Sequence, residues 1–302
     1  MRAIIAGGSG LIGSALAKKF SNEGREVIIL SRYPSMHKNN HQGIIIEKWD
    51  GYSSKGWVKY IDDSTAIINL SGANISGGRW TKKRKNEIRE SRINSGKALS
   101  QAILESDKKP YVLIQASAVG YYGSSIEENI TEDHPAGRGF LSQTCADWED
   151  STRHVEKYGV RRVIIRQGVV LSKQSVVFKR MVLPYKLFAG GPIGKGTQWF
   201  PWIHEFDLVN AIRFLVDNDQ TKGPYNLTSP GIVTNNDFAK SLGKITHRPV
   251  WFPIPEFGLK IIFGEMASIL LEGQQVIPQK LTEKGFMFKY PTIVLALQDL
   301  VA

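Results

Sequence analysis

The chain has 302 residues, of which 42% are hydrophobic and 22% charged, as in a globular protein that can bury a core in one large or two modest domains. No apolar run approaches the roughly 18 residues of a membrane span, the MRAIIAGG start is unlike a signal peptide, and the one cysteine, Cys145, cannot form an internal disulfide, so we expect a cytoplasmic protein with no membrane partner. The formal net charge of +11 favours phosphate-rich ligands, but no zinc-finger or RNA-recognition motif is present, and we expect no nucleic-acid partner.

Short apolar runs predict strands throughout the first 170 residues, at 3–6, 26–30, 44–47, 66–70, 112–116 and 162–166. Most of these runs are continuous and β-branched, as expected for parallel strands that are buried on both faces. Stretches with helical length and composition lie between them, at 11–23, about 82–104 and about 143–158. The alternation predicts an α/β fold, a Rossmann-type doubly wound parallel sheet.

The basic stretch RWTKKRKNEIRESR, at residues 79–92, begins just before the second predicted helix. It is interpreted either as a solvated helix face or as part of a pocket for a multiply charged small molecule.

The composition changes after about residue 171, where Pro and Gly become frequent in AGGPIGKG, FPWIHEFDL and WFPIPEFG. We expect residues 1–170 to form a dinucleotide-binding Rossmann domain, with a return segment at about 200–220. Residues 171–302 are expected to form mostly a smaller C-terminal substrate lobe.

The stretch AGGSGLIG places Gly7, Gly10 and Gly13 between the first predicted strand and the first predicted helix. In such a turn the first glycine permits the bend, the second lets a pyrophosphate approach, and the third lets the helix pack on the strand. The free N–H groups at the helix start, those of Leu11, Ile12 and Gly13, would then bind phosphate. A glycine-rich turn without a ligand is the alternative.

The second predicted strand is followed by Ser31 and Arg32, where an NAD site usually has a carboxylate that binds the ribose 2′-OH. A guanidinium and a hydroxyl suit a 2′-phosphate instead. We therefore expect NADP(H), with NAD(H) as the less favoured cofactor. Arg32 could also be a surface residue that stacks on adenine.

With these residues the sequence resembles the extended short-chain dehydrogenase/reductases, which include NAD-dependent epimerases and dehydratases. The stretches INLSGANI, ASAVGYYG, DWE, RQGVVL, GGPIGKGTQWFPWIHEFDL and LEGQQVIPQKLTEKGFMFKYP are similar to one atypical branch, the epimerase family proteins. The likeness includes the small C-terminal domain of that branch, at about 248–298.

The resemblance implies positions for further cofactor-binding residues. These are Leu70, Ser71 and Gly72 after the fourth strand; Glu87 and Arg92 on the following helix; Ser117 and Ala118 after the fifth strand; and Gly168, Val169 and Val170 near the nicotinamide. Arg92 could equally be an ordinary arginine on the helix surface.

The catalytic Tyr-x-x-x-Lys pair of the wider superfamily is absent, since no tyrosine has a lysine four residues later. Aligned on Glu149, the pair's positions hold Leu141 and Cys145, which cannot carry out that proton chemistry. Tyr121 and Tyr122 are the candidate proton donors, beside Ser117, although either could simply pack in the pocket wall. We expect Cys145 to be an inert small hydrophobe.

Other candidates have structural alternatives. His204 is a possible titrating group or a structural histidine, and Asp147-Trp148-Glu149 could tie a helix to the sheet. The loop with Lys195, Gln198, Trp199, Phe200 and Trp202 either lines a substrate pocket or buries its own aromatic side chains. No His, Cys or carboxylate cluster has metal-ligand spacing, so we expect no metal.

The sequence thus predicts an NADP(H)-binding oxidoreductase or epimerase-like protein, a monomer or homodimer, that acts on an unidentified small molecule, with a nucleotide sugar as the substrate that the resemblance suggests. A non-catalytic, NADPH-sensing regulator or scaffold is the alternative.

Overall fold

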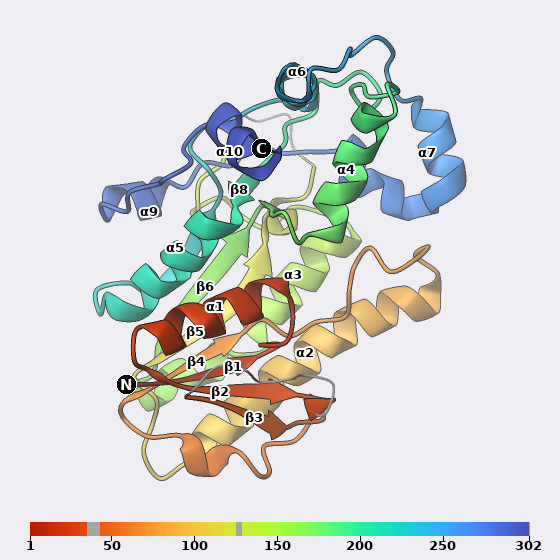
Figure 1. Ribbon diagram of the computed structural model, residues 1–302. Helices are drawn as coiled ribbons and strands as arrows, with labels where there is room; N and C mark the ends of the chain where they lie inside the picture. The colour runs from red at the N-terminus through yellow and green to blue at the C-terminus, as the bar shows by residue number, and fades with distance from the viewer. Residues whose placement is uncertain (35–42, 125–128, 302) are drawn as a thin grey trace.

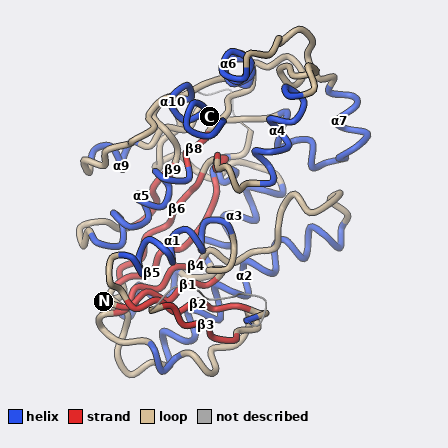
Figure 2. The backbone as a smooth tube through the Cα atoms, viewed as in Figure 1, coloured by secondary structure: helices blue, strands red, loops and turns tan. Residues whose placement is uncertain are grey.

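A seven-stranded parallel sheet forms the centre of the computed structural model, which describes residues 1–34, 43–124 and 129–301 (Figures 1 and 2). The strands are β1 (Arg2–Ala6), β2 (Glu26–Ser31), β3 (Ile44–Lys48), β4 (Thr65–Asn69), β5 (Val112–Ala118), β6 (Arg161–Gln167) and β9 (Gly223–Leu227). They lie in the order β3-β2-β1-β4-β5-β6-β9, and each neighbouring pair is parallel. The winding direction reverses between β1 and β4, where the carboxyl ends of the strands open a crevice for ligands. The predicted fold class is confirmed.

Helices cover both faces of the sheet because its strands are apolar on both sides. Ile5 of β1 belongs to a core that includes Leu16 of α1 (Leu11–Asn22) and Ile212 of α5 (Glu205–Asp217). Its neighbour Ile4 belongs to a core that includes Leu99 of α2 (Lys82–Glu105). Figure 1 shows these layers. The α-helices are α1 (Leu11–Asn22), α2 (Lys82–Glu105), α3 (Phe140–Asp150), α4 (Val176–Lys186), α5 (Glu205–Asp217), α6 (Asn235–Thr246), α7 (Glu256–Phe263), α8 (Ser268–Leu271), α9 (Gln279–Glu283) and α10 (Ile293–Val301). The 3-10 helices are η2 (Val58–Tyr60), η3 (Val119–Tyr122), η4 (Arg153–Tyr158) and η5 (Gly264–Ala267).

A second core lies beyond the carboxyl edge of the sheet, in the upper part of Figure 1. Helices α4, α6 and α10 meet there around Trp202, Phe238 and Leu297. The short strands β7 (Val169–Leu171) and β8 (Trp202–His204) pair beside it. The chain after residue 171 also returns to the sheet, because α5 packs on α1 and β9 pairs with β6. None of the helices in the described ranges has the length and apolarity to cross a bilayer.

The structure corrects the third predicted helix, 143–158. An α-helix covers Phe140–Asp150 and is followed by the separate 3-10 helix η4. The α-helix stops because its last carbonyls have other donors: the Ser151 hydroxyl donates to Trp148 O at 2.6 Å, and Arg162 donates to Glu149 O at 2.8 Å. The predicted fourth strand also ends one residue early, at Asn69.

Candidate functional site

The glycine turn between β1 and α1 requires glycine at two positions, one because of its backbone conformation and one because a Cβ would not fit. Gly7 has φ +78°, and a Cβ there would lie 2.8 Å from the Leu70 carbonyl oxygen. A Cβ on Gly13 would collide with the carbonyl oxygen of Gly7. A Cβ on Gly10 would meet only the Gly7 oxygen, at 3.4 Å, so this position is open on its outer side. The turn therefore brings α1 and the chain after β4 very close to the end of β1.

Helix α1 begins without a side-chain cap. Its N-cap residue is Gly10, and no acidic residue lies in its first turn. The N–H groups of Leu11, Ile12 and Gly13 are at the end where an α-helix leaves its donors unpaired. Among the described residues none of these three donors has a hydrogen-bond acceptor. A phosphate at this point would gain both free donors and the positive end of the helix dipole.

Ser31 and Arg32 follow this turn along the same sheet edge, at the end of β2. Ser31 is buried, and its oxygen accepts a hydrogen bond from the Tyr33 amide at 3.3 Å. Arg32 is exposed and lies 5.9 Å from the Tyr33 ring centroid. Within the described chain Arg32 has no carboxylate partner. An exposed guanidinium can bind an anion such as a phosphate.

The chain after β4 holds a buried hydroxyl that has no partner among the described residues, that of Ser71. The Arg92 guanidinium, from α2, lies against the next residue along the chain: a Cβ on Gly72 would be 3.0 Å from Arg92 Cζ. Arg92 donates to the carbonyl oxygens of Ala73 and Ile88, at 3.1 and 2.9 Å, and its guanidinium lies 5.0 Å from the Trp148 ring centroid. Burial lowers the pKa of Arg92, and no carboxylate faces it in the described structure. A cation and an unpaired hydroxyl from neighbouring parts of the chain suit an anionic ligand with hydroxyl or phosphate oxygens.

Glu87, in contrast, does not join these groups. Its carboxylate forms an ion pair with Arg84 at 2.6 Å, one turn earlier on α2, and is largely exposed. No contact in the described structure connects it to the glycine turn or to Ser71.

A buried polar network occupies the carboxyl ends of β5 and β6. The Ser117 hydroxyl donates to Glu149 Oε1 at 2.7 Å, and both Arg166 Nε and Nη2 donate to the same carboxylate at 2.9 Å. Although burial opposes it, the hydrogen bonds and charge of Glu149 raise the pKa of Arg166. Ser117 is completely buried, and because its hydroxyl donates to Glu149, its proton is already used in a hydrogen bond within the fold.

The two candidate tyrosines differ sharply in their surroundings. The Tyr122 hydroxyl donates to Asn226 Oδ1 at 2.6 Å and accepts from Arg166 at 3.0 Å, and burial raises the pKa of Tyr122 to about 12. Tyr121 is half-buried and its ring centroid lies 3.5 Å from Arg166 Cζ. Its hydroxyl has no hydrogen-bond partner among the described residues. Of the two, only Tyr121 has an uncommitted proton.

Leu141 and Cys145, which align with the superfamily's Tyr–Lys pair in the sequence, both lie near Gly120. A Cβ on Gly120 would lie 3.5 Å from Leu141 Cβ and 4.0 Å from Cys145 Sγ. Cys145 is buried, and burial raises the pKa of its thiol to about 11, so the thiol stays protonated near neutral pH. The groups near Gly120 at these two positions are therefore an apolar side chain and a neutral thiol.

His204 and the Asp147 carboxylate have structural contacts. His204 Nδ1 accepts from the Phe206 amide at 3.0 Å, which caps α5, and its ring stacks on Tyr290 with centroids 3.9 Å apart. Burial lowers the pKa of His204. Asp147 pairs with Arg89 at 2.7 Å. These contacts of His204 and Asp147 are between elements of the fold, as the structural alternative for both residues expects.

In the loop before β8 and at the first residue of β8, several candidate side chains make contacts within the fold. Gln198 donates to the carbonyl oxygens of Ile193 and Leu270, at 3.1 and 3.0 Å, and Trp202 donates to Gly231 O at 3.0 Å. Phe200 packs against Phe238, and Lys195 is exposed. Gly168 donates to Leu227 O at 3.0 Å, and Val169 and Val170 belong to β7. The described residues include no group of three His, Cys, Asp or Glu side chains that could hold a metal ion.

A cavity of about 750 Å³ adjoins the glycine turn. Its walls include Gly8 and Ser9 of the turn, Lys18 of α1, and Phe206 and Asn210 of α5. Ser71, Ser117 and Tyr121 are not among its lining residues.

Sequence reasoning missed the part of the network formed by Arg166, Asn226 and Glu132. Glu132 accepts from the Asn226 amide at 3.0 Å, and burial raises the pKa of Glu132. A charged residue at 166, at the end of an otherwise apolar strand, is the signal that could have revealed it, because a buried charge needs a partner. Nothing near position 132 indicates burial.

Comparison with known proteins identifies relatives that match this chain over its whole given length. Residues 3–228 match the family described as "NAD dependent epimerase/dehydratase family", and residues 254–300 match a domain of unknown function (DUF1731). "Epimerase family protein YfhF" of Bacillus subtilis (strain 168) is 39% identical over 305 residues, covering 100% of this chain and 98% of that protein. "Epimerase family protein SDR39U1 homolog, chloroplastic" of Arabidopsis thaliana is 36% identical over 308 residues, covering 100% of this chain and 87% of that protein. The crystal structure of "human epimerase family protein SDR39U1 (isoform2) with NADPH" superimposes with a TM-score of 0.88 at 31% identity, covering 99% of each chain.

Proposed function

The chain belongs to the NAD-dependent epimerase/dehydratase family, and from that premise we propose that it is an NADP(H)-binding oxidoreductase or epimerase-like enzyme that acts on a small molecule. The observation that carries the proposal is the uncapped start of α1 behind the positive-φ turn at Gly7. The human relative of known structure was solved with NADPH, which supports the choice of cofactor.

Several side chains fit such a cofactor. The amides of Leu11, Ile12 and Gly13 would hold its pyrophosphate, and Ser31 and Arg32 would hold its 2′-phosphate. Ser71 and Arg92 would contact the adjoining ribose and phosphate oxygens, since the Ser71 hydroxyl has no hydrogen-bond partner and no carboxylate faces Arg92 among the described residues. When bound, the nicotinamide supplies a hydride donor or acceptor.

Tyr121 is the side chain that we assign to proton transfer with the substrate. It follows β5 on the cofactor edge, and its hydroxyl is uncommitted in the described structure. Arg166, beneath its ring, is fixed by Glu149 and would favour the phenolate that proton donation leaves behind. Ser117 and Tyr122 position this region rather than exchange protons, because their hydroxyls are bonded within the network. We include nucleotide sugars in the substrates to be screened because the family name refers to epimerases.

A regulator that binds NADPH without chemistry is the second candidate function. The observation that favours it is that Leu141 and Cys145, the residues that the sequence alignment puts at the catalytic Tyr and Lys positions, are apolar or neutral; both lie near Gly120. Net reduction of a carbonyl substrate by the wild type, measured as loss of the NADPH absorbance band, would exclude it. Conversion of a nucleotide sugar into its epimer, measured by chromatography because epimerisation returns the hydride and leaves the band unchanged, would also exclude it.

Calorimetric titration with NADPH and with NADH tests the cofactor assignment. We expect the wild type to prefer NADPH by about tenfold or more, since two charge-assisted hydrogen bonds at about 1.5–3 kcal/mol each exceed the 1.4 kcal/mol of a tenfold ratio. Arg32→Ala should lose the preference and keep its NADH affinity. Arg153→Ala, an exposed arginine paired with Asp150 at the far end of α3, is the matched control and should keep the preference. Equal affinities of the wild type for both nucleotides would contradict the assignment.

A further inference from the structure

A surface of exposed apolar side chains lies on α7 and on the segment that precedes it. Trp251, Phe252 and Phe257 are 71%, 77% and 76% exposed, and Ile261 is also largely exposed. Helix α7 buries none of its residues. Contiguous apolar surface on this scale marks an interaction site, because isolated exposed apolar residues are common but clusters of aromatic ones are not.

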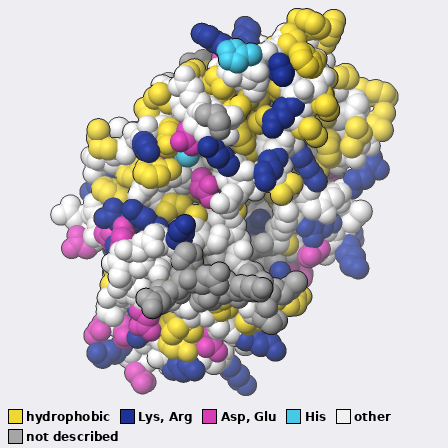
Figure 3. Space-filling model, viewed as in Figure 1, with side chains coloured by type: hydrophobic (Ala, Val, Ile, Leu, Met, Phe, Trp, Pro, Cys, Tyr) yellow, Lys and Arg dark blue, Asp and Glu magenta, His cyan; other side chains and the backbone are white. Residues whose placement is uncertain are grey.

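The same surface continues onto the end of α4. Phe252 lies beside Gly191, where a Cβ would collide with the Phe252 carbonyl, and the Arg248 guanidinium lies 4.3 Å from the Phe188 ring centroid. Leu187 and Phe188 are both exposed there. We call the set Leu187, Phe188, Trp251, Phe252, Phe257 and Ile261 the apolar rim. Figure 3 shows yellow side chains gathered at the upper right, over α4 and α7.

A groove of about 540 Å³ with basic walls adjoins the apolar rim, between α4 and α10. Its apolar lining includes Leu183 and Leu300, and all four of its charged lining residues are cations. These are Lys173, Lys179, Arg180 and Lys186. Lysines and arginines lie beside the yellow side chains over α4 in Figure 3.

The carboxylates near this face are engaged. Glu256 is 3.7 Å from Lys260 on α7, and Glu265 pairs with Lys85. Asp299 of α10, which interacts electrostatically with Lys173, accepts a hydrogen bond from the Tyr290 hydroxyl at 2.8 Å. Among the described residues, Lys179, Arg180 and Lys186 therefore present positive charge without an ion-pair partner, next to aromatic and aliphatic side chains.

We propose that this face docks onto a bilayer surface that carries anionic lipids. Aromatic side chains prefer the headgroup level of a bilayer, aliphatic ones prefer the region just below it, and lysine and arginine bind lipid phosphates. A second copy of the chain is a poorer occupant, because it would bring two sets of cations together in a protein of net charge +11. An acidic peptide would satisfy the groove but would leave the apolar rim, which extends to Ile261, largely in water.

This docking would place α7 on the membrane without crossing it, as an interfacial helix does. The sequence expectation of no membrane partner rested on the length of apolar runs, which detects only spanning segments. The inference does not depend on the proposed enzymatic function.

Co-sedimentation with vesicles tests the proposal. The full chain is mixed with vesicles of phosphatidylcholine alone, or of phosphatidylcholine and phosphatidylglycerol in equal amounts. We expect binding to the mixed vesicles, at least about tenfold weaker binding to phosphatidylcholine alone, and a decrease as salt shortens the Debye length.

Two pairs of variants locate the surface. Phe252→Ser/Phe257→Ser should lower the partition coefficient by about tenfold or more through the loss of buried apolar area. Lys179→Gln/Lys186→Gln should lower it by a similar factor. The matched controls are Tyr52→Ser for the aromatic pair and Lys55→Gln/Lys59→Gln for the lysine pair; they are exposed at the opposite end of the molecule and should bind like the wild type. All the substituted side chains are exposed, and equal unfolding temperatures would show that each variant is folded.

Failure of the wild type to sediment with the mixed vesicles at low salt would overturn the proposal. So would equal binding to the two vesicle types, or control variants that lose as much binding as the rim variants. A concentration-dependent dimer in analytical ultracentrifugation that Phe252→Ser/Phe257→Ser dissociates would assign the face to a second copy instead. NADPH titration of the same variants keeps this test separate from that of the proposed function.

Discussion

At the scale of single residues, the most informative side chains are the polar ones that the fold leaves without partners. The Ser71 hydroxyl is unpaired, and Arg92, which lies against the neighbouring Gly72, faces no carboxylate among the described residues. Leaving a buried polar group unpaired costs free energy, so such groups persist where a ligand satisfies them. Ser117 and Tyr122, by contrast, have every proton placed in the network around Glu149 and Arg166.

Ser71→Ala separates a ligand contact from a structural one. Because the hydroxyl has no partner in the described fold, we expect its removal to leave the free energy of unfolding unchanged or slightly higher, and to weaken NADPH binding by about threefold to tenfold. Urea unfolding and calorimetry measure the two quantities. Ser142→Ala is the control: its hydroxyl donates to Tyr121 O at 2.7 Å, so stability should fall by about 1 kcal/mol. Unchanged NADPH affinity in Ser71→Ala would contradict the assigned contact.

At the scale of elements, one buried network joins β5, α3, β6, η3 and β9. Arg166 of β6 connects Glu149 of α3 with Tyr122 of η3, and Tyr122 in turn binds Asn226 of β9. The network reaches the C-terminal segment, because Asn226 also donates to Ile277 O at 3.0 Å. A network of this kind fixes the relative positions of the elements at the carboxyl edge, and breaking one buried charge from its partners is costly.

Substitution of the two adjacent tyrosines tests whether Tyr122 stabilises the fold while Tyr121 transfers a proton. Tyr122→Phe should lower the free energy of unfolding by about 1–3 kcal/mol, because it leaves Asn226 and Arg166 short of a partner. Tyr121→Phe removes a hydroxyl with no internal partner and should change stability little. If the proposed enzyme turns over a substrate, Tyr121→Phe should lower kcat by about a hundredfold or more. Thermal unfolding and NADPH oxidation are the measurements, and equal destabilisation by both variants would contradict the assignment.

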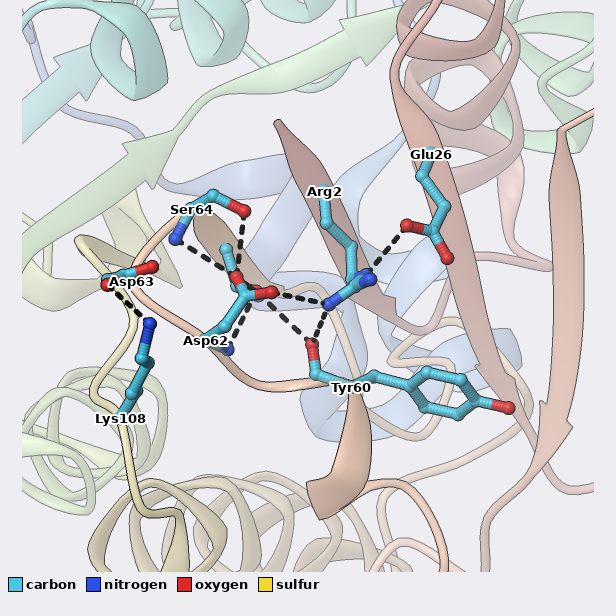
Figure 4. A network of polar contacts seen from close by, with 8 residues as sticks. Arg2, Glu26, Tyr60, Asp62, Asp63, Ser64 and Lys108 are labelled. Carbon is cyan, nitrogen blue, oxygen red and sulfur yellow. Dashed lines mark hydrogen bonds and ion pairs between the residues drawn. The ribbon is translucent and has the colours of Figure 1, made fainter.

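At the scale of the whole molecule, the net charge of +11 means that the folded protein repels itself more strongly as its carboxylates are protonated. Its free energy of unfolding in acid therefore depends on the carboxylates that are paired with cations. Figure 4 shows one such carboxylate, Asp62, which accepts from Arg2 of β1 at 2.8 Å, while Arg2 also binds Glu26 of β2. Although burial raises it, hydrogen bonds from Thr65 and Ser64 and the charge of Arg2 lower the pKa of Asp62 to about 2. This network ties the loop before β4 to the first two strands.

The depressed pKa predicts loss of stability in acid. A carboxyl group whose pKa is lower in the folded state contributes stability above its unfolded pKa of about 4, and that contribution is lost as the pH falls towards about 2. We expect Asp62→Asn to lower the unfolding temperature at about pH 7 and to have a much smaller effect at about pH 2.5. Scanning calorimetry at both pH values measures this. The neighbouring Asp63→Asn, which affects only an exposed pair with Lys108, should change little at either pH, and a pH-independent effect of Asp62→Asn would contradict the linkage.

The sequence by itself determined the doubly wound sheet, the glycine turn and the family. Those features depend on local patterns: continuous β-branched runs, a helix-length segment after Gly13, and motif stretches whose resemblance the full-length relatives confirm. The end of α3 at Asp150 was not predictable in this way, because the donors that stop it come from Ser151 and from Arg162 on another strand.

Only the tertiary structure decided which candidate hydroxyls are free. Ser117, Tyr121 and Tyr122 lie within six residues of one another, yet two of them are bonded to Glu149 and Asn226, which are 32 and 104 residues away in the sequence. The cluster of Trp251, Phe252 and Phe257 with the cations of α4 is likewise invisible in the sequence. A hydrogen bond or a shared surface depends on distances in space, and those are set by the packing of elements that are remote along the chain.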